Sequence, residues 1–141
     1  MSSHTLMILQ NTAIMISLVV ACSVGDLYDF VVQKDDEVRE VLTGPEGKDK
    51  DLYSAMKSIA DSYGSLTKQL QAHNMSVLPL ARRLYDRGVP EMILEVFFLD
   101  DLRRFFNWQE TEINYFHSLY SEVQDKWRRF EAKYRNISLH L

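Results

Sequence analysis

The residues best suited to chemistry are four histidines and one cysteine, and they are scattered along the chain. His4, His73, His117 and His140 lie far apart, and none has a second His or Cys at metal-ligand spacing. Cys22 lies in an apolar stretch, where a thiol behaves as a small hydrophobic side chain. No phosphate-binding, dinucleotide-binding or serine-hydrolase motif occurs. We therefore predict no catalytic residue, no metal site and no cofactor, and we expect that the protein is not an enzyme.

Aromatic residues form the densest pattern in the sequence. Eleven of the sixteen lie between Phe97 and Tyr134. Rings fill cores, but they also supply much of the energy of protein interfaces. A small bundle cannot bury both members of each adjacent Phe pair in its own core, so some rings must face a neighbour. We predict a partner interface that includes Phe97, Phe98, Phe105, Phe106, Trp108 and Trp127.

Basic residues suggest a second surface. Lys126, Arg129 and Lys133 follow one another at spacings of three and four, which places them on one face of a helix. Such a face can bind anionic lipid headgroups. The alternative is an ordinary solvated face, because acidic residues are interleaved with these three.

Composition limits the classes of function. The chain has 141 residues, 46% of them hydrophobic and 26% charged, as expected for a folded globular protein. Sixteen Lys and Arg against twenty Asp and Glu give a net charge of −4, which disfavours a dedicated nucleic-acid binder. The single cysteine excludes an intrachain disulfide.

The first 25 residues differ from the rest because they carry no Asp, Glu, Lys or Arg. Residues 6–24 are 19 predominantly apolar residues, about 28 Å of helix, which is close to the length that crosses a bilayer. Three interpretations compete: a retained transmembrane anchor, a cleaved signal peptide, and a buried helix of a bundle. We divide the chain into this segment, 1–25, and one helical domain, 26–141.

The remaining sequence predicts helices and no strand. Asp26 is expected to cap a first helix, which Gly44-Pro45 ends. A second helix, about 50–73, is expected from a heptad pattern, and a short helix follows over 76–87. The apolar heptad positions of the helix at 50–73 are Leu52, Met56, Ile59, Tyr63, Leu66 and Leu70.

The C-terminal half predicts an apolar helical segment and then a long helix. Residues 90–106 form the apolar segment, and Asn107 with Glu110 resembles a capping box at the start of the long helix, about 108–138. The expected fold is an all-α bundle in which the two longer helices pack at a shallow angle. The helix at 108–138 carries the second heptad row, which is Ile113, Phe116, Tyr120, Val123, Trp127, Phe130, Tyr134 and Ile137.

These patterns favour a non-enzymatic, membrane-anchored helical subunit of a larger membrane assembly. Its expected partners are other protein subunits and membrane lipid. We expect a single-pass membrane protein, and an organellar inner membrane is one possible location. One alternative is a secreted, cysteine-free helical bundle that binds a small apolar ligand or a receptor. Another is a cytosolic interaction domain whose first helix belongs to the core.

Overall fold

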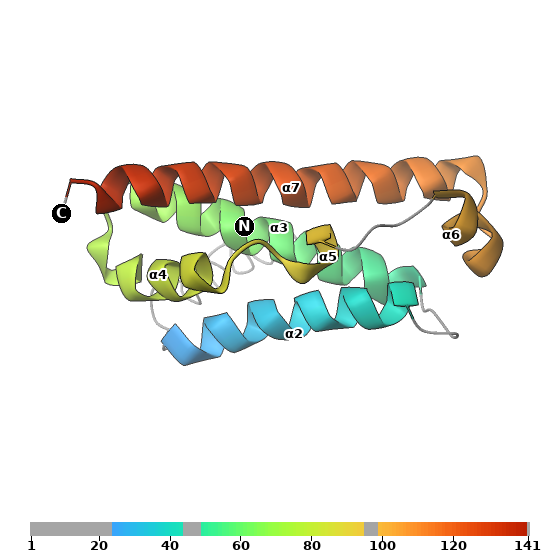
Figure 1. The fold of residues 1–141 in the computed structure, drawn as a ribbon, viewed down its shortest axis with the longest axis horizontal. Coiled ribbons are helices and arrows are strands. Elements are labelled where there is room, and N and C mark those ends of the chain that lie inside the picture. Colours follow the sequence, from blue (N-terminus) through green and yellow to red (C-terminus); the bar gives the residue numbers. More distant parts are fainter. Residues whose placement is uncertain (1–23, 44–48, 95–98, 141) are drawn as a thin grey trace, which may run out of the picture.

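The computed structural model describes residues 24–43, 49–94 and 99–140, and these residues form helices without any strand (Figure 1). The predicted all-helical bundle is therefore confirmed for this part of the chain. Of the apolar segment 6–24, residues 6–23 lie outside the described residues. The elements are α2 (Val24–Thr43), α3 (Asp49–Gln71), the 3₁₀ turn η1 (Met75–Val77), α4 (Leu78–Arg87), α5 (Glu91–Leu94), α6 (Leu99–Phe106) and α7 (Glu110–Ser138).

The helices form a bundle in which neighbours in space are not always neighbours in sequence (Figure 1). The two longest helices, α3 and α7, lie side by side and run in the same direction. Helix α2 packs against α3 in the opposite direction, while α4 and α5 lie along α2 in its own direction. The short α6 lies at the end of the bundle where α7 begins.

The predicted heptad positions of α3 are all buried and form the centre of the core. Each of the six, from Leu52 to Leu70, is fully inaccessible to solvent. The heptad spacing keeps these side chains on one stripe, which packs mainly against α7. On α7 the predicted row is buried as well, except that Tyr120 and Ile137 are partly exposed.

The ends of α3 and α4 follow from backbone conformation. α3 ends before His73, which has a φ of 58°, and the Asn74 amide N–H then donates to the Gln69 carbonyl at 3.0 Å. α4 ends at Gly88, whose φ of 94° is accessible to glycine without strain. The chain therefore turns at both ends of α4 and breaks the third arm of the bundle into short helices.

The structure corrects two predicted helix starts. Asp26 lies within α2, whose first described residue is Val24, and therefore not at its cap. The long helix begins at Glu110, and its capping contact is a hydrogen bond from the Gln109 amide to Glu112 Oε2 at 2.8 Å. Asn107 instead takes a left-handed conformation, with φ 55°, which ends α6 and delays the next helix.

The apolar segment 90–106 is divided. It contains α5 and α6 as separate helices, and residues 95–98 between them lie outside the described residues. Pro90 explains where α5 starts, because proline is disfavoured in the interior of a helix and tolerated just before it or in its first turn.

Candidate interaction site

Aromatic rings form a connected network at the end of the bundle where α3 and α7 begin. Phe105 packs edge-on against Phe106 with ring centroids 5.0 Å apart, and Phe106 stacks on Trp108 at 4.8 Å. Trp108 continues to Phe116 of α7 at 5.5 Å. We call this region the aromatic end and define it by Tyr53, Phe105, Phe106, Trp108, Tyr115 and Phe116.

A second branch of the network crosses from α7 to α3. Tyr53 lies 6.1 Å from Trp108 and packs edge-on against Tyr115 at 4.8 Å between ring centroids. The branch therefore ties the first turns of the two longest helices together. Such offset and edge-on pairs are the favoured geometries of aromatic packing.

The network runs from the core to the surface. Trp108 and Phe116 are buried, Phe106 is half-buried, and Phe105 and Tyr115 are 50% and 52% exposed. The outer rings are held in place by the inner rings, so they are presented to solvent in fixed positions. Rigid aromatic side chains of this kind are the usual anchors of protein interfaces.

Charged side chains surround the aromatic end. Arg103 Nη2 pairs with Glu110 Oε2 at 3.0 Å, and Arg104 Nη2 pairs with Asp101 Oδ1 at 2.6 Å. All four side chains are largely exposed, so each pair adds little to stability. An apolar centre with a polar rim is the common anatomy of an interface.

The structure separates the six residues that the sequence predicts for a partner interface. Phe105 and Phe106 lie on the surface of the aromatic end, and Trp108 is buried beneath them. Trp127 is buried elsewhere in the core, 5.3 Å from the ring of Tyr63 and 5.6 Å from that of Phe130. Phe97 and Phe98 lie outside the described residues. The role of all six residues in partner binding stays a prediction.

The three predicted headgroup-binding residues lie along the flank of α7. Lys126 extends over α3, where its side-chain carbons come within 3.4 Å of the position that a Cβ on Gly64 would occupy. Arg129 Nε pairs with Asp125 Oδ2 at 3.0 Å. Lys133 is half-buried. Lipid binding by this row stays a prediction.

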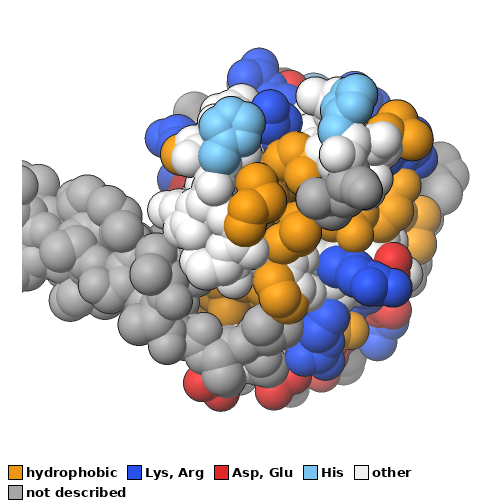
Figure 2. Space-filling view, turned by 90° about the vertical axis from the view of Figure 1, so that its left-hand side faces the viewer, with side chains coloured by type: hydrophobic (Ala, Val, Ile, Leu, Met, Phe, Trp, Pro, Cys, Tyr) orange, Lys and Arg blue, Asp and Glu red, His pale blue; other side chains and the backbone are white. Residues whose placement is uncertain are grey.

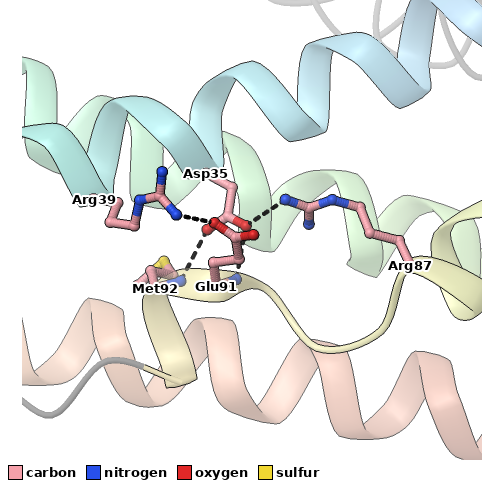
Figure 3. Close-up of polar contacts among 5 residues, drawn as sticks. All are labelled: Asp35, Arg39, Arg87, Glu91 and Met92. Atoms are coloured by element: carbon pink, nitrogen blue, oxygen red, sulfur yellow. Dashed lines mark hydrogen bonds and ion pairs between the residues drawn. The ribbon is translucent and has the colours of Figure 1, made fainter.

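A buried polar cluster between α2 and α5 was missed by the sequence analysis (Figure 3). The carboxylate of Asp35, which is fully buried, accepts a hydrogen bond from Arg87 Nη2 at 2.9 Å. It also accepts the amide N–H groups of Glu91 at 2.7 Å and Met92 at 3.0 Å. Arg39 forms an ion pair with the Glu91 side chain beside it. The cluster satisfies the first amides of α5 and fixes α4 and α5 to α2.

Burial changes the protonation equilibria around this cluster. Burial is the largest single influence on the pKa of Arg87 and lowers it, but the hydrogen bond to Asp35 and the negative charges of Asp35 and Glu91 together raise this pKa above its usual value. Burial also raises the pKa of the Tyr63 hydroxyl well above its usual range, and the charge of Arg87 opposes this rise only in part. Because both carboxylate oxygens of Asp35 are occupied by protein donors, the cluster has the properties of a structural clamp.

Other parts of the described structure offer little for a ligand. Within residues 24–43, 49–94 and 99–140, no three His, Cys, Asp or Glu side chains are placed to hold a metal ion. A hollow of about 460 Å³ beside α2 is lined by Lys34, Glu37, Glu40, Val41 and Ser54, a mostly charged set. An apolar ligand would find few partners there.

None of the described helices is both long enough and apolar enough to span a membrane. Comparison with the models of known protein families, with curated proteins and with solved structures finds no match.

Proposed function

We propose that this protein is a non-enzymatic, membrane-anchored helical subunit that binds other subunits of a membrane assembly through its aromatic end. The observation that carries the proposal is the aromatic network that continues from the buried Trp108 to the half-exposed Phe105 and Tyr115. A folded domain that exposes rings packed on a connected aromatic network has a surface suited to a protein partner.

The anchor part of the proposal is supported by the sequence before α2. Residues 1–25 have no charged side chain, and residues 6–24 match the length of a bilayer span. The domain that follows holds all 36 charged residues of the chain. An assembly subunit needs these two parts and no catalytic group.

The first experiment measures the intact mass of the protein from its own source. Retention of the segment predicts a mass near 16.5 kDa, less at most the first Met. Loss of roughly 23–25 N-terminal residues would identify a cleaved signal peptide and favour the secreted bundle instead.

The second experiment tests the aromatic end in native membranes. The full chain carrying Phe105→Asp and Tyr115→Asp is extracted in mild detergent, and its complex is sized by native electrophoresis. We expect the wild type to migrate in a large complex and the variant to migrate as a small species, because buried charges oppose docking.

Phe30→Asp is the matched control, since Phe30 is an exposed aromatic residue of α2 away from the aromatic end. It should leave the large complex intact. A wild-type protein that migrates alone, or a large complex that survives the double substitution, would contradict the proposed role of this surface.

A further inference from the structure

The opposite end of the bundle has its own chemistry. It is formed by the end of α3, η1 and the first turns of α4, together with the last turns of α7 (Figure 1). We call it the turn end and define it by residues 68–83 and 132–140. α2 begins at this same end, so the chain that leaves the apolar segment 6–24 enters the domain here (Figure 1).

Apolar side chains are exposed at the turn end. Met75 in η1 is 42% exposed, and Leu139 after α7 is 81% exposed. Leu78 and Ile137 are half-buried beneath them. Figure 2 shows the molecule from this end, with hydrophobic side chains gathered in its middle, His, Lys and Arg side chains at the top and right, and Asp and Glu side chains along the lower edge. We call the cationic side chains of this end the basic ring, which the acidic side chains of other segments interrupt at the lower edge.

The two segments that define the turn end contain no acidic residue. Neither residues 68–83 nor residues 132–140 contain an Asp or Glu, although the chain has twenty of them. The same two segments supply five basic residues and two histidines, of which one basic residue is Lys133 of the predicted headgroup row. The seven are Lys68, His73, Arg82, Arg83, Lys133, Arg135 and His140.

These cations are only weakly neutralised by their neighbours. Arg82 lies 3.8 Å from Asp86, and Arg135 lies 3.6 Å from Glu131, both at the long limit of an ion pair. Arg83 stacks its guanidinium over the ring of Tyr28 at 4.1 Å, and among the described residues it has no ion-pair partner. Asp86 and Glu131 lie just outside the two segments that define the turn end, and the first turn of α2 brings Asp26 to the same end.

We propose that the turn end lies against the anionic headgroups of the membrane that residues 6–24 enter, with Met75 and Leu139 in the interfacial layer. This inference rests on the proposed function, because it takes the anchor as given. Exposed apolar side chains beside Lys and Arg are the composition that binds an anionic lipid surface. A protein partner would need acidic groups to match this ring, whereas the lipid surface is held next to it by the anchor.

The orientation also agrees with the placement of the aromatic end. Helix α7 runs from the aromatic end to the turn end, and its 29 residues span about 43 Å. A domain that stands on its turn end therefore holds the aromatic end roughly 40 Å from the lipid, where a partner subunit can reach it.

The test measures the depth of spin labels in the full chain, reconstituted in vesicles of phosphatidylcholine with about 30% phosphatidylserine. One label is placed on the native Cys22, which lies in the apolar segment. Two others are placed on Met75→Cys and Tyr115→Cys in a Cys22→Ser background. Collisions with oxygen report contact with lipid, and collisions with a nickel chelate report contact with water.

We expect the Cys22 label and the Met75→Cys label to collide mainly with oxygen, and the Tyr115→Cys label to collide mainly with the nickel chelate. A Cys22 label in the bilayer with a Met75→Cys label in water would overturn the inference and leave the anchor intact. A Met75→Cys label shielded from both reagents would also overturn it, because a protein partner would then cover this end. A Cys22 label in water would instead overturn the proposed anchor, and the inference with it.

Charge reversal tests the basic ring. Arg82→Glu with Arg83→Glu should move the Met75→Cys label towards water by a several-fold change in the ratio of the two collision rates. The matched control is Arg103→Glu with Arg104→Glu, a pair of adjacent exposed arginines at the aromatic end, which should leave that ratio unchanged. Equal responses from the two pairs, at unchanged helical circular dichroism, would show that the contact does not depend on these charges and would overturn the role of the ring.

Discussion

The seam between α3 and α7 and the seam between α2 and the α4–α5 segment are held together by different chemistry. The first is a continuous apolar stripe in which many fully buried side chains share the stabilisation. The second has the buried carboxylate of Asp35 near its middle, where it binds one guanidinium and two backbone amides. An apolar seam distributes its stability over many residues, whereas a buried polar cluster concentrates it in one.

Removal of the Asp35 carboxylate should produce the largest effect. Asp35→Ala leaves the Arg87 charge and two amides of α5 without a partner, so we expect a loss of about 3 kcal/mol in the free energy of unfolding. Urea unfolding followed by circular dichroism measures this loss. Hydrogen exchange should show that residues 88–94 lose protection before α3 and α7 do.

Asp36→Ala is the matched control for this substitution, because Asp36 is the adjacent carboxylate and is partly exposed. It should change the free energy of unfolding by no more than about 0.5 kcal/mol. Similar losses for both variants would contradict the clamp.

Removal of one methyl group from the apolar seam should have a moderate effect. Ile59 is fully buried on α3, and Ile59→Val should lower the free energy of unfolding by about 1 kcal/mol, because the neighbouring side chains keep most of their contacts. Urea unfolding measures it, with the 65%-exposed Leu94 changed to Ala as the control expected to be near zero. A loss as large as that of Asp35→Ala would show that the stability of the apolar seam is not spread over many residues.

Removal of the Tyr63 hydroxyl should have the smallest effect at neutral pH. Its Oη is buried and has no hydrogen-bond partner among the described residues, so Tyr63→Phe should change the free energy of unfolding by less than about 1 kcal/mol. Urea unfolding near neutral pH measures the difference.

The same variant should have a larger effect in alkali. Burial raises the pKa of Tyr63 above the 10.0 of a free tyrosine, so the unfolded chain releases this proton at a lower pH than the folded protein does. Stability contributed by this group is present below that pH and is lost as the pH rises above it. Urea midpoints across this range should therefore fall less steeply for Tyr63→Phe than for the wild type. Tyr115→Phe, at a half-exposed ring, should follow the wild type.

The apolar seam could be predicted from the sequence because its pattern is local. Six positions of α3 repeat at spacings of three and four, and that period is enough to place them on one stripe. The start of α7 was predicted two residues too early, because Asn suits both a helix cap and the left-handed turn that Asn107 takes, and the local pattern does not choose between them. Phe105 precedes this turn and is exposed, whereas Trp108 follows it and is buried.

The polar clamp left a partial signal in the sequence. Asp35 occupies a core position in the row Leu27, Val31, Asp35, Val38 and Leu42, which predicts a buried charge in need of a partner. Its partner Arg87 is 52 residues away. No local pattern connects the two positions, because their contact exists only after α4 and α5 have packed along α2.

The parallel arrangement of α3 and α7 has a consequence for folding during synthesis. Their contacts join residues far apart in the sequence, as in the ion pair between Lys57 and Glu122, which are separated by 65 positions. Helices α2 and α3 can form a hairpin as soon as they emerge, but the stripe of α3 that faces α7 remains uncovered until α7 has left the ribosome. We therefore expect the nascent chain to bind chaperones that recognise exposed hydrophobic segments, and to be released from them only when α7 has packed against α3.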